Sequence, residues 1–207
     1  MKNHQKFWDR IAKSYAKQPI ADQNAYQHKL DTIREHLTPE SEVFEFGCGT
    51  GSTALALSGA VRSIVATDLS QKMLDIAEER QAEEGASNVK FQRLDIESSA
   101  IEGNEYDVVL GMSIIHLLEN REQVFQRVAD SLKPGGVFFS STVCTGTSNV
   151  FLRFILPLAK PFGLLPNVQF IDEAQLCSEL EATGFSIEYR YRPRPDAAVF
   201  LMARKGE

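Results

Sequence analysis

The chain has 207 residues, 43% of them hydrophobic, and a formal net charge of −6. This length supplies one substantial core but is short for two, so we expect one domain over residues 1–207. Phosphate binding needs an excess of lysine and arginine, so the acidic balance argues against a nucleic-acid partner.

The cysteines and histidines predict neither disulfides nor a metal site. Cys48, Cys144 and Cys177 are odd in number and widely spaced, and no pair of histidines has the H-x-x-x-H spacing. The N-terminus lacks the apolar segment of a secretory signal. These features fit a reducing, cytoplasmic setting.

The first half of the chain alternates helical stripes with short β-prone runs. Asn24–Leu37 has apolar residues at helical spacing, and Ser70 can cap a later helix that buries Met73. The full expected order is helix 24–37, a strand from Val43, helix 52–58, strand 64–67, the helix after Ser70, and strand 89–93.

The second half continues this alternation. Tyr106–Met112 is an apolar run without alternation, as expected of a central strand covered on both faces. We then expect a helix from Asn120 to a stop at 132–136, strand 137–143, a helix capped by Asp172, and strands 185–191 and 198–203.

The last two strands are joined by residues 192–197 alone, too few for a crossover helix, so they must be antiparallel. The predicted fold is therefore α/β: five alternating β/α units and a C-terminal antiparallel hairpin, in a seven-stranded, mostly parallel sheet. The segment Glu188–Asp196 interleaves arginine and tyrosine, as an RNA-binding surface does, but strand alternation explains it more simply.

A glycine loop follows the first strand, with Gly47, Gly49 and Gly51 at alternate positions. Missing Cβ atoms let a ligand lie against the backbone there. Asp68 ends the next strand, where an acid commonly accepts ribose hydroxyls. Together they indicate an adenosine-containing cofactor. NAD is disfavoured, because Ser52 stands where the third glycine of a dinucleotide fingerprint belongs.

The chain resembles the class I S-adenosylmethionine-dependent methyltransferases of the small-molecule type, with a Rossmann-like, doubly wound sheet. The resemblance covers roughly Phe7 to Lys205, which is nearly the whole chain, as expected if the chain is one domain. The motifs that carry it are EFGCGTG at 45–51, ATDLSQKML at 66–74, RLDIES at 93–98, DVVLGMSIIHLL at 107–118 and LKPGGVFF at 132–139.

The resemblance implies roles on the first two strands. Gly47, Gly49 and the rest of the glycine loop to Gly51 would hold the methionine part of S-adenosylmethionine, and Glu45 would orient its ammonium group. Asp68 would accept hydrogen bonds from the ribose hydroxyls, an interpretation that its place after the strand favours over a charge before a helix N-terminus.

It also implies roles further along. Met73 would pack on the adenine, or simply belong to the core. Asp95 would bind the adenine amino group beside Ile96, or cap its own turn. Gly111, with its neighbour Met112, would line the pocket floor.

His116 is the histidine near the strand-four motif, and it is our candidate general base. In the family pattern this position more often shapes the pocket. Methyl transfer from a sulfonium requires alignment and exclusion of water, not an obligatory base, so both interpretations stay open.

Two segments outside the cofactor motifs are expected to contact the acceptor. Residues 1–23 would form a lid carrying Trp8 and Tyr15, or alternatively a helix docked on the sheet. Residues 144–171 form an apolar insertion expected to cap the substrate. Its three prolines prevent it from spanning a bilayer, and its apolar wall would comprise Phe151, Phe154, Leu158 and Phe162.

The leading hypothesis is a cytoplasmic methyltransferase acting on a small, partly apolar acceptor. The alternatives are a cofactor-binding subunit without catalysis, a macromolecule-directed methyltransferase and an NAD-dependent reductase. Acceptor identity and homodimer formation stay open.

Overall fold

The computed structural model describes residues 2–101, 105–144 and 168–206, with the side chains of residues 2 and 3 left aside. Its centre is a seven-stranded sheet in the order β3-β2-β1-β4-β5-β7-β6. The strands are β1 (Glu42–Phe46), β2 (Ser63–Asp68), β3 (Val89–Arg93), β4 (Tyr106–Met112), β5 (Leu132–Thr142), β6 (Phe185–Tyr191) and β7 (Val199–Lys205).

Parallel pairing joins β3, β2, β1, β4 and β5, whereas β7 is antiparallel to both β5 and β6. The predicted mostly parallel sheet with a C-terminal antiparallel hairpin is confirmed. Tyr189 and Tyr191 of β6 both lie against His28, and the Tyr189 hydroxyl is 2.8 Å from His28 Nε2.

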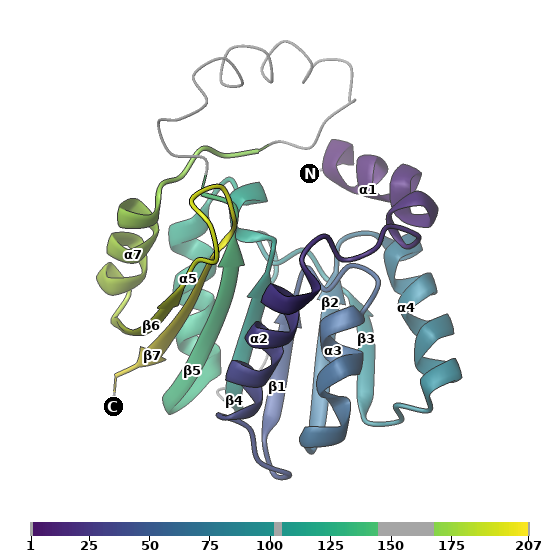
Figure 1. The fold of residues 1–207 in the computed structure, drawn as a ribbon, viewed down its shortest axis with the longest axis horizontal. Helices are drawn as coiled ribbons and strands as arrows, with labels where there is room; N and C mark the ends of the chain where they lie inside the picture. The colour runs from purple at the N-terminus through teal and green to yellow at the C-terminus, as the bar shows by residue number, and fades with distance from the viewer. Residues whose placement is uncertain (1, 102–104, 145–167, 207) are drawn as a thin grey trace.

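Helices cover both faces of the sheet (Figure 1). They are α1 (Lys2–Tyr15), α2 (Gln23–Arg34), α3 (Ser52–Leu57), α4 (Gln71–Glu84), α5 (Arg121–Ser131) and α7 (Glu173–Ala182), with 3-10 turns η1 (Ser58–Ala60) and η2 (Ile115–Leu117). Side-chain caps fix where several of them begin: Asp22, Ser70, Asn120 and Asp172 each accept a backbone N–H of the first turn.

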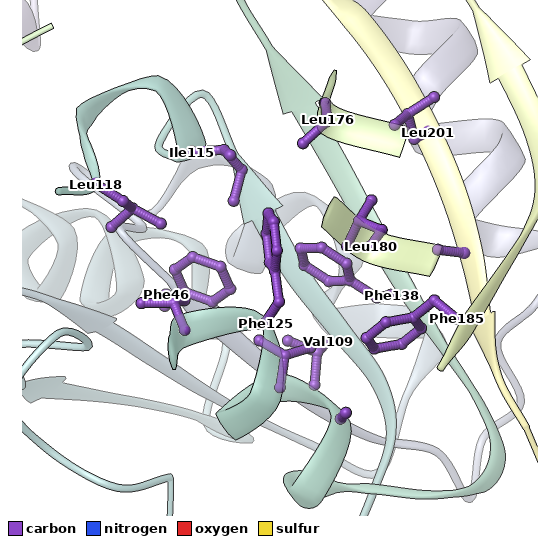
Figure 2. Close-up of a cluster of buried hydrophobic side chains, with 14 of the residues drawn as sticks. Phe46, Val109, Ile115, Leu118, Phe125, Phe138, Leu176, Leu180, Phe185 and Leu201 are labelled. Carbon is purple, nitrogen blue, oxygen red and sulfur yellow. The ribbon is translucent and has the colours of Figure 1, made fainter. Parts of the chain in front are cut away.

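The two faces have separate cores. One buries α2, α3 and α4 residues against β1, β2 and β4, and the other buries α5 and α7 residues beneath the aromatic side chains of β1 and β5. Figure 2 shows the second, with Phe46, Phe125 and Phe138 at its centre. Burial on both faces explains the unbroken apolar run of β4.

The β3–β4 connection differs from the regular alternation that the sequence suggested. Residues 94–101 form turns and extended backbone rather than a helix. Asp95 Oδ1 accepts the Glu97 N–H, and the Asp95 carbonyl accepts the Ser98 and Ser99 N–H groups. A side chain that bonds its local backbone competes with helix formation, which accounts for the turn.

Two element boundaries also differ. The expected start of strand five at Val137 is too late, because β5 begins at Leu132 and pairs there with Tyr106. The helix expected over 24–37 ends at Arg34. The insertion at 144–171 lies almost wholly outside the described residues, with only its ends, Cys144 and 168–171, placed.

Among the helices of the described ranges, none combines the length and apolar character needed to cross a bilayer. The single-domain division, with its lid at 1–23 and cap at 144–171, stays a prediction.

Candidate functional site

Two adjoining cavities lie where the central parallel strands end. The first is lined by the ends of β2, β3 and β4 together with α1, and the second by the end of β1, the start of α2, the end of β5 and the loop before β7. They share five wall residues: Tyr15, Gly47, Gly49, Met112 and Ser113. In parallel sheets, ligands bind at this carboxyl edge.

The glycine loop contributes to the cavities through two of its three glycines. Gly47 and Gly49 line both cavities, with φ of 65° and 55°. Gly51 lies on neither wall: a Cβ there would stand 2.7 Å from the Phe91 ring. Gly51 therefore allows α4 and β3 to pack against the loop, a different role from the one the resemblance implied.

Gly111 is likewise absent from both walls. A Cβ at Gly111 would approach the Phe46 ring to 2.7 Å and Phe138 to 3.2 Å. The pocket-floor position expected for Gly111 is therefore taken by its neighbour Met112, whereas Gly111 makes room for the aromatic core of Figure 2.

Asp68 lies in the first cavity and is fixed by backbone donors. Its Oδ2 accepts the Gly49 N–H at 2.9 Å and its Oδ1 accepts the Ser70 N–H at 2.8 Å. Burial raises the pKa of Asp68, while these two hydrogen bonds lower it. Each oxygen keeps a lone pair after these bonds, so the carboxylate can still accept hydrogen bonds from a ligand.

The remaining sequence-predicted residues of this cavity also meet there. Met73 and Ile96 are buried side chains on its wall. Asp95 lines it as well, while also capping its own turn through Glu97. Sequence reasoning missed other wall residues, because their apolar side chains are also typical of core: Leu69, Leu94, Ile114, Leu117 and Leu118.

Glu45 borders the second cavity and is almost completely buried, with 1% of its surface exposed. Its Oε2 has no hydrogen-bond partner among the described residues. Burial raises the pKa of this carboxyl to about 8; a hydrogen bond from the Ala54 backbone opposes the shift and the Asp68 charge adds to it. A buried carboxyl without a full set of partners suits a cationic ligand group.

Helix α1 closes the first cavity from above the strand ends, where Figure 1 shows it beside the top of α4. Trp8 and Tyr15 line the cavity, with ring centroids 6.0 Å apart. The Ser70 hydroxyl donates to Asp9 Oδ1 at 2.6 Å, which ties α1 to the start of α4. Helix α1 therefore packs against α4, and its action as a lid stays a prediction.

Ser113 has a left-handed backbone, with φ of 61°, where both cavities meet. Its N–H donates to the Ser141 carbonyl at 2.7 Å, which holds the ends of β4 and β5 together. Such strain in a non-glycine residue is typical of functional sites.

His116 is on neither cavity wall. Its Nδ1 is buried and has no hydrogen-bond partner within the described part of the chain, and burial lowers its pKa. Phe151, Phe154, Leu158 and Phe162 lie outside the described residues. The described residues contain no cluster of three or more potential metal ligands.

Comparisons with known proteins agree with this geometry. Residues 43–136 match a family described as "Methyltransferase domain". A ubiquinone biosynthesis O-methyltransferase of Thiobacillus denitrificans is 30% identical over 153 residues, covering 71% of this chain and 65% of that protein. One from Burkholderia thailandensis is 26% identical over 187 residues, covering 88% and 78%.

The chain therefore spans slightly under two thirds of the Thiobacillus relative's length. Among solved structures, the DhpI–SAH complex superposes with a TM-score of 0.77 at 22% identity, covering 99% of this chain and 96% of DhpI, a likeness of fold. The matched domain, these relatives and the shared fold make the chain similar to the class I S-adenosylmethionine-dependent methyltransferases.

Proposed function

We propose that this protein transfers a methyl group from S-adenosylmethionine to an oxygen of a small, partly apolar acceptor, by in-line displacement. The observation that carries the proposal is a pair of carboxyls on neighbouring strands: the partly buried Asp68 in the first cavity and the buried Glu45 in the second, with Gly47 and Gly49 lining both cavities. The name of the relatives, ubiquinone biosynthesis O-methyltransferase, supports oxygen as the acceptor atom.

The residues present fit an adenosine group in the first cavity. Asp68 would accept the ribose hydroxyls with the lone pairs that its backbone donors leave free. Met73 and Ile96 would face the adenine ring, and Asp95 would accept its amino group. Trp8 and Tyr15 would exclude water from above.

The methionine end would pass Gly47 and Gly49 into the second cavity. There Glu45 Oε2, which has no hydrogen-bond partner among the described residues, would accept a hydrogen bond from the ammonium group. A ligand without a donor at this position could not make that hydrogen bond. When bound, S-adenosylmethionine supplies a methyl group activated by a positively charged sulfur. The chain's own residues then have to align the acceptor and keep water away.

Turnover tests this proposal. The protein is incubated with S-adenosylmethionine and a panel of hydroxylated aromatic acids and their esters, and products are analysed by mass spectrometry. We expect a product heavier by one methylene group, together with calorimetric binding of S-adenosylhomocysteine and none of NAD. Binding without any methylated product would favour the non-catalytic subunit, and no binding of either sulfur nucleoside would refute the proposal.

A further inference from the structure

The second cavity has more positive than negative charge on its wall. Lys29, Arg80 and Arg194 contribute cations, but of these three only Arg194 forms an ion pair among the described residues, with Nη1 2.9 Å from Asp22 Oδ2. Within the described part of the chain, Arg80 donates hydrogen bonds to hydroxyl and carbonyl oxygens. Glu45 offers little compensation. Without a ligand, burial raises its pKa to about 8 and keeps it mostly protonated at neutral pH, and in the complex proposed above it would pair with the cofactor's ammonium group.

Among the described residues, Lys29 has no carboxylate partner and its ammonium group makes one hydrogen bond. Helix α2 presents it, half-buried, to the cavity, and its Nζ donates to the Ser141 hydroxyl at 2.8 Å. An ammonium group has three donors, and the described residues give this one no ion pair. Burial lowers the pKa of Lys29, and the more distant Asp22 charge offsets this only in part.

The strand order separates Lys29 from the part of the cavity assigned to the cofactor. Ser141, its partner, is on β5, whereas Glu45 is on β1, and β4 lies between these strands. Neighbouring strands are about 4.8 Å apart, so Ser141 is displaced roughly 10 Å across the sheet from the β1 end. Met112 and Ser113, at the end of β4, occupy the space between.

The size and remaining wall of the cavity suit a small molecule. Its volume is about 510 Å³, within the usual range of about 300–1,000 Å³ for ligand sites. Its wall also includes the apolar side chains of Ile20, Ala25 and Met112. A ligand matching this wall is partly apolar and carries one negative group.

Resting on the function proposed above, we propose that Lys29, positioned by Ser141, binds an anionic oxygen of the methyl acceptor, a carboxylate or phenolate, in the second cavity. The acceptor is thus an anionic small molecule rather than a neutral one. Ser141 is a positioning residue, because it acts by holding the ammonium group.

Benzoate and its neutral analogue benzamide test this charge requirement. Each is titrated into protein saturated with S-adenosylhomocysteine, and binding is followed by ligand-observed NMR. We expect Lys29→Met to weaken benzoate binding by about tenfold or more, because a charge-assisted hydrogen bond is lost, and to leave benzamide binding unchanged. Lys90→Met, which removes an exposed lysine on β3 outside the cavity, should change neither.

Circular dichroism checks that Lys29→Met folds. If Lys29→Met does not fold, Ser141→Ala provides the test instead. Loss of the positioning hydroxyl should weaken benzoate binding several-fold. Absence of benzoate binding to the wild-type protein, or equal binding by wild type and the Lys29 and Ser141 variants, would overturn the inference.

A second arm identifies the source of the anion. S-adenosylhomocysteine carries a carboxylate, and methylthioadenosine does not. If Lys29→Met weakens binding of the first but not the second, Lys29 holds the cofactor's carboxylate and the acceptor assignment is wrong. If the wild-type protein does not bind S-adenosylhomocysteine, the proposed function itself is refuted. Failure of the proposed function can therefore be distinguished from failure of the Lys29 assignment.

Discussion

The two cavities at the carboxyl edge of the sheet each contain a carboxyl, and the two carboxyls differ in their hydrogen bonding. In the first, Asp68 accepts backbone N–H groups from Gly49 and Ser70, one on each oxygen. In the second, Glu45 keeps one oxygen without a partner among the described residues, and burial raises its pKa to about 8. Asp68 is fixed by its own backbone donors, whereas Glu45 keeps one oxygen available to a ligand.

The cavities differ as much in how the chain builds them. The first is assembled from the ends of β2, β3 and β4, each carrying a recognisable motif, and from α1. The second also takes its polar wall from α2, β5 and the loop before β7. The first cavity can therefore be predicted from sequence motifs more readily than the second.

The largest effect should come from the unsatisfied carboxyl. An exposed glutamate ionises near 4.5 and the buried Glu45 near 8. Between these values the folded protein holds a proton that the unfolded chain has lost, so the free energy of unfolding should fall as pH rises from 4.5 to 8, then level off. Glu45→Gln should abolish this fall, which is of the order of a few kcal/mol.

Urea denaturation at pH 5 to 9 measures this slope. Glu83→Gln, on the exposed side of α4, provides the control and should keep the wild-type slope. A wild-type protein whose stability does not change between pH 5 and 8 would show that Glu45 has a partner in solution, and the contrast between the cavities would disappear.

The second prediction concerns the carboxylate that is already fixed. Asp68→Asn should weaken S-adenosylhomocysteine binding by about 10- to 100-fold, because a charged acceptor is worth about 1.5–3 kcal/mol. The amide would also point its donors at the Gly49 or Ser70 N–H group. Calorimetry gives the affinity, and thermal unfolding shows how much of the loss reflects a distorted loop. Unchanged affinity would assign Asp68 to a structural role.

Sequence patterns predicted the sheet better than the site. Period and capping signals located all seven strands, and the short link at 192–197 required the antiparallel hairpin. The turn after β3 was foreseen only as an alternative role of Asp95, whose local hydrogen bonds compete with helix formation.

The sequence analysis missed some site residues for a different reason. Lys29 lies on the polar side of an amphipathic helix, where a lysine is ordinarily exposed, and only the fold brings it to Ser141, 112 positions away in the chain. Gly51 and Gly111 are the opposite case. Their positions in the motifs suggested contact with a ligand, but glycine is needed there because a Cβ atom would clash with a neighbouring aromatic ring. Contacts between distant segments cannot be read from local spacing.

A smaller effect is expected from loosening the lid of the first cavity. Asp9→Asn replaces the charged acceptor of the Ser70 hydroxyl, which should weaken α1 docking and raise the dissociation rate of S-adenosylhomocysteine by about three- to tenfold. Stopped-flow displacement measures this rate. Asp75→Asn, on the exposed side of α4, is the control and should leave the rate unchanged, because this carboxylate accepts a hydrogen bond from Gln71 of the same helix. Equal rates in all three proteins would show that α1 does not retain the ligand.

The smallest effect on turnover should come from His116, which lies outside both cavity walls. His116→Gln should alter the rate of the methylation assay by less than about threefold and leave its pH profile unchanged, whereas loss of a general base costs about 100-fold or more.

The His116→Gln substitution should change the stability of the protein instead. Burial lowers the pKa of His116 below 6.5, so the wild-type protein should lose stability as pH falls below 6.5, while His116→Gln should lose less. A 100-fold drop in turnover with a shifted pH profile would place the imidazole beside the acceptor, and the second cavity would then contain a base as well as a cation.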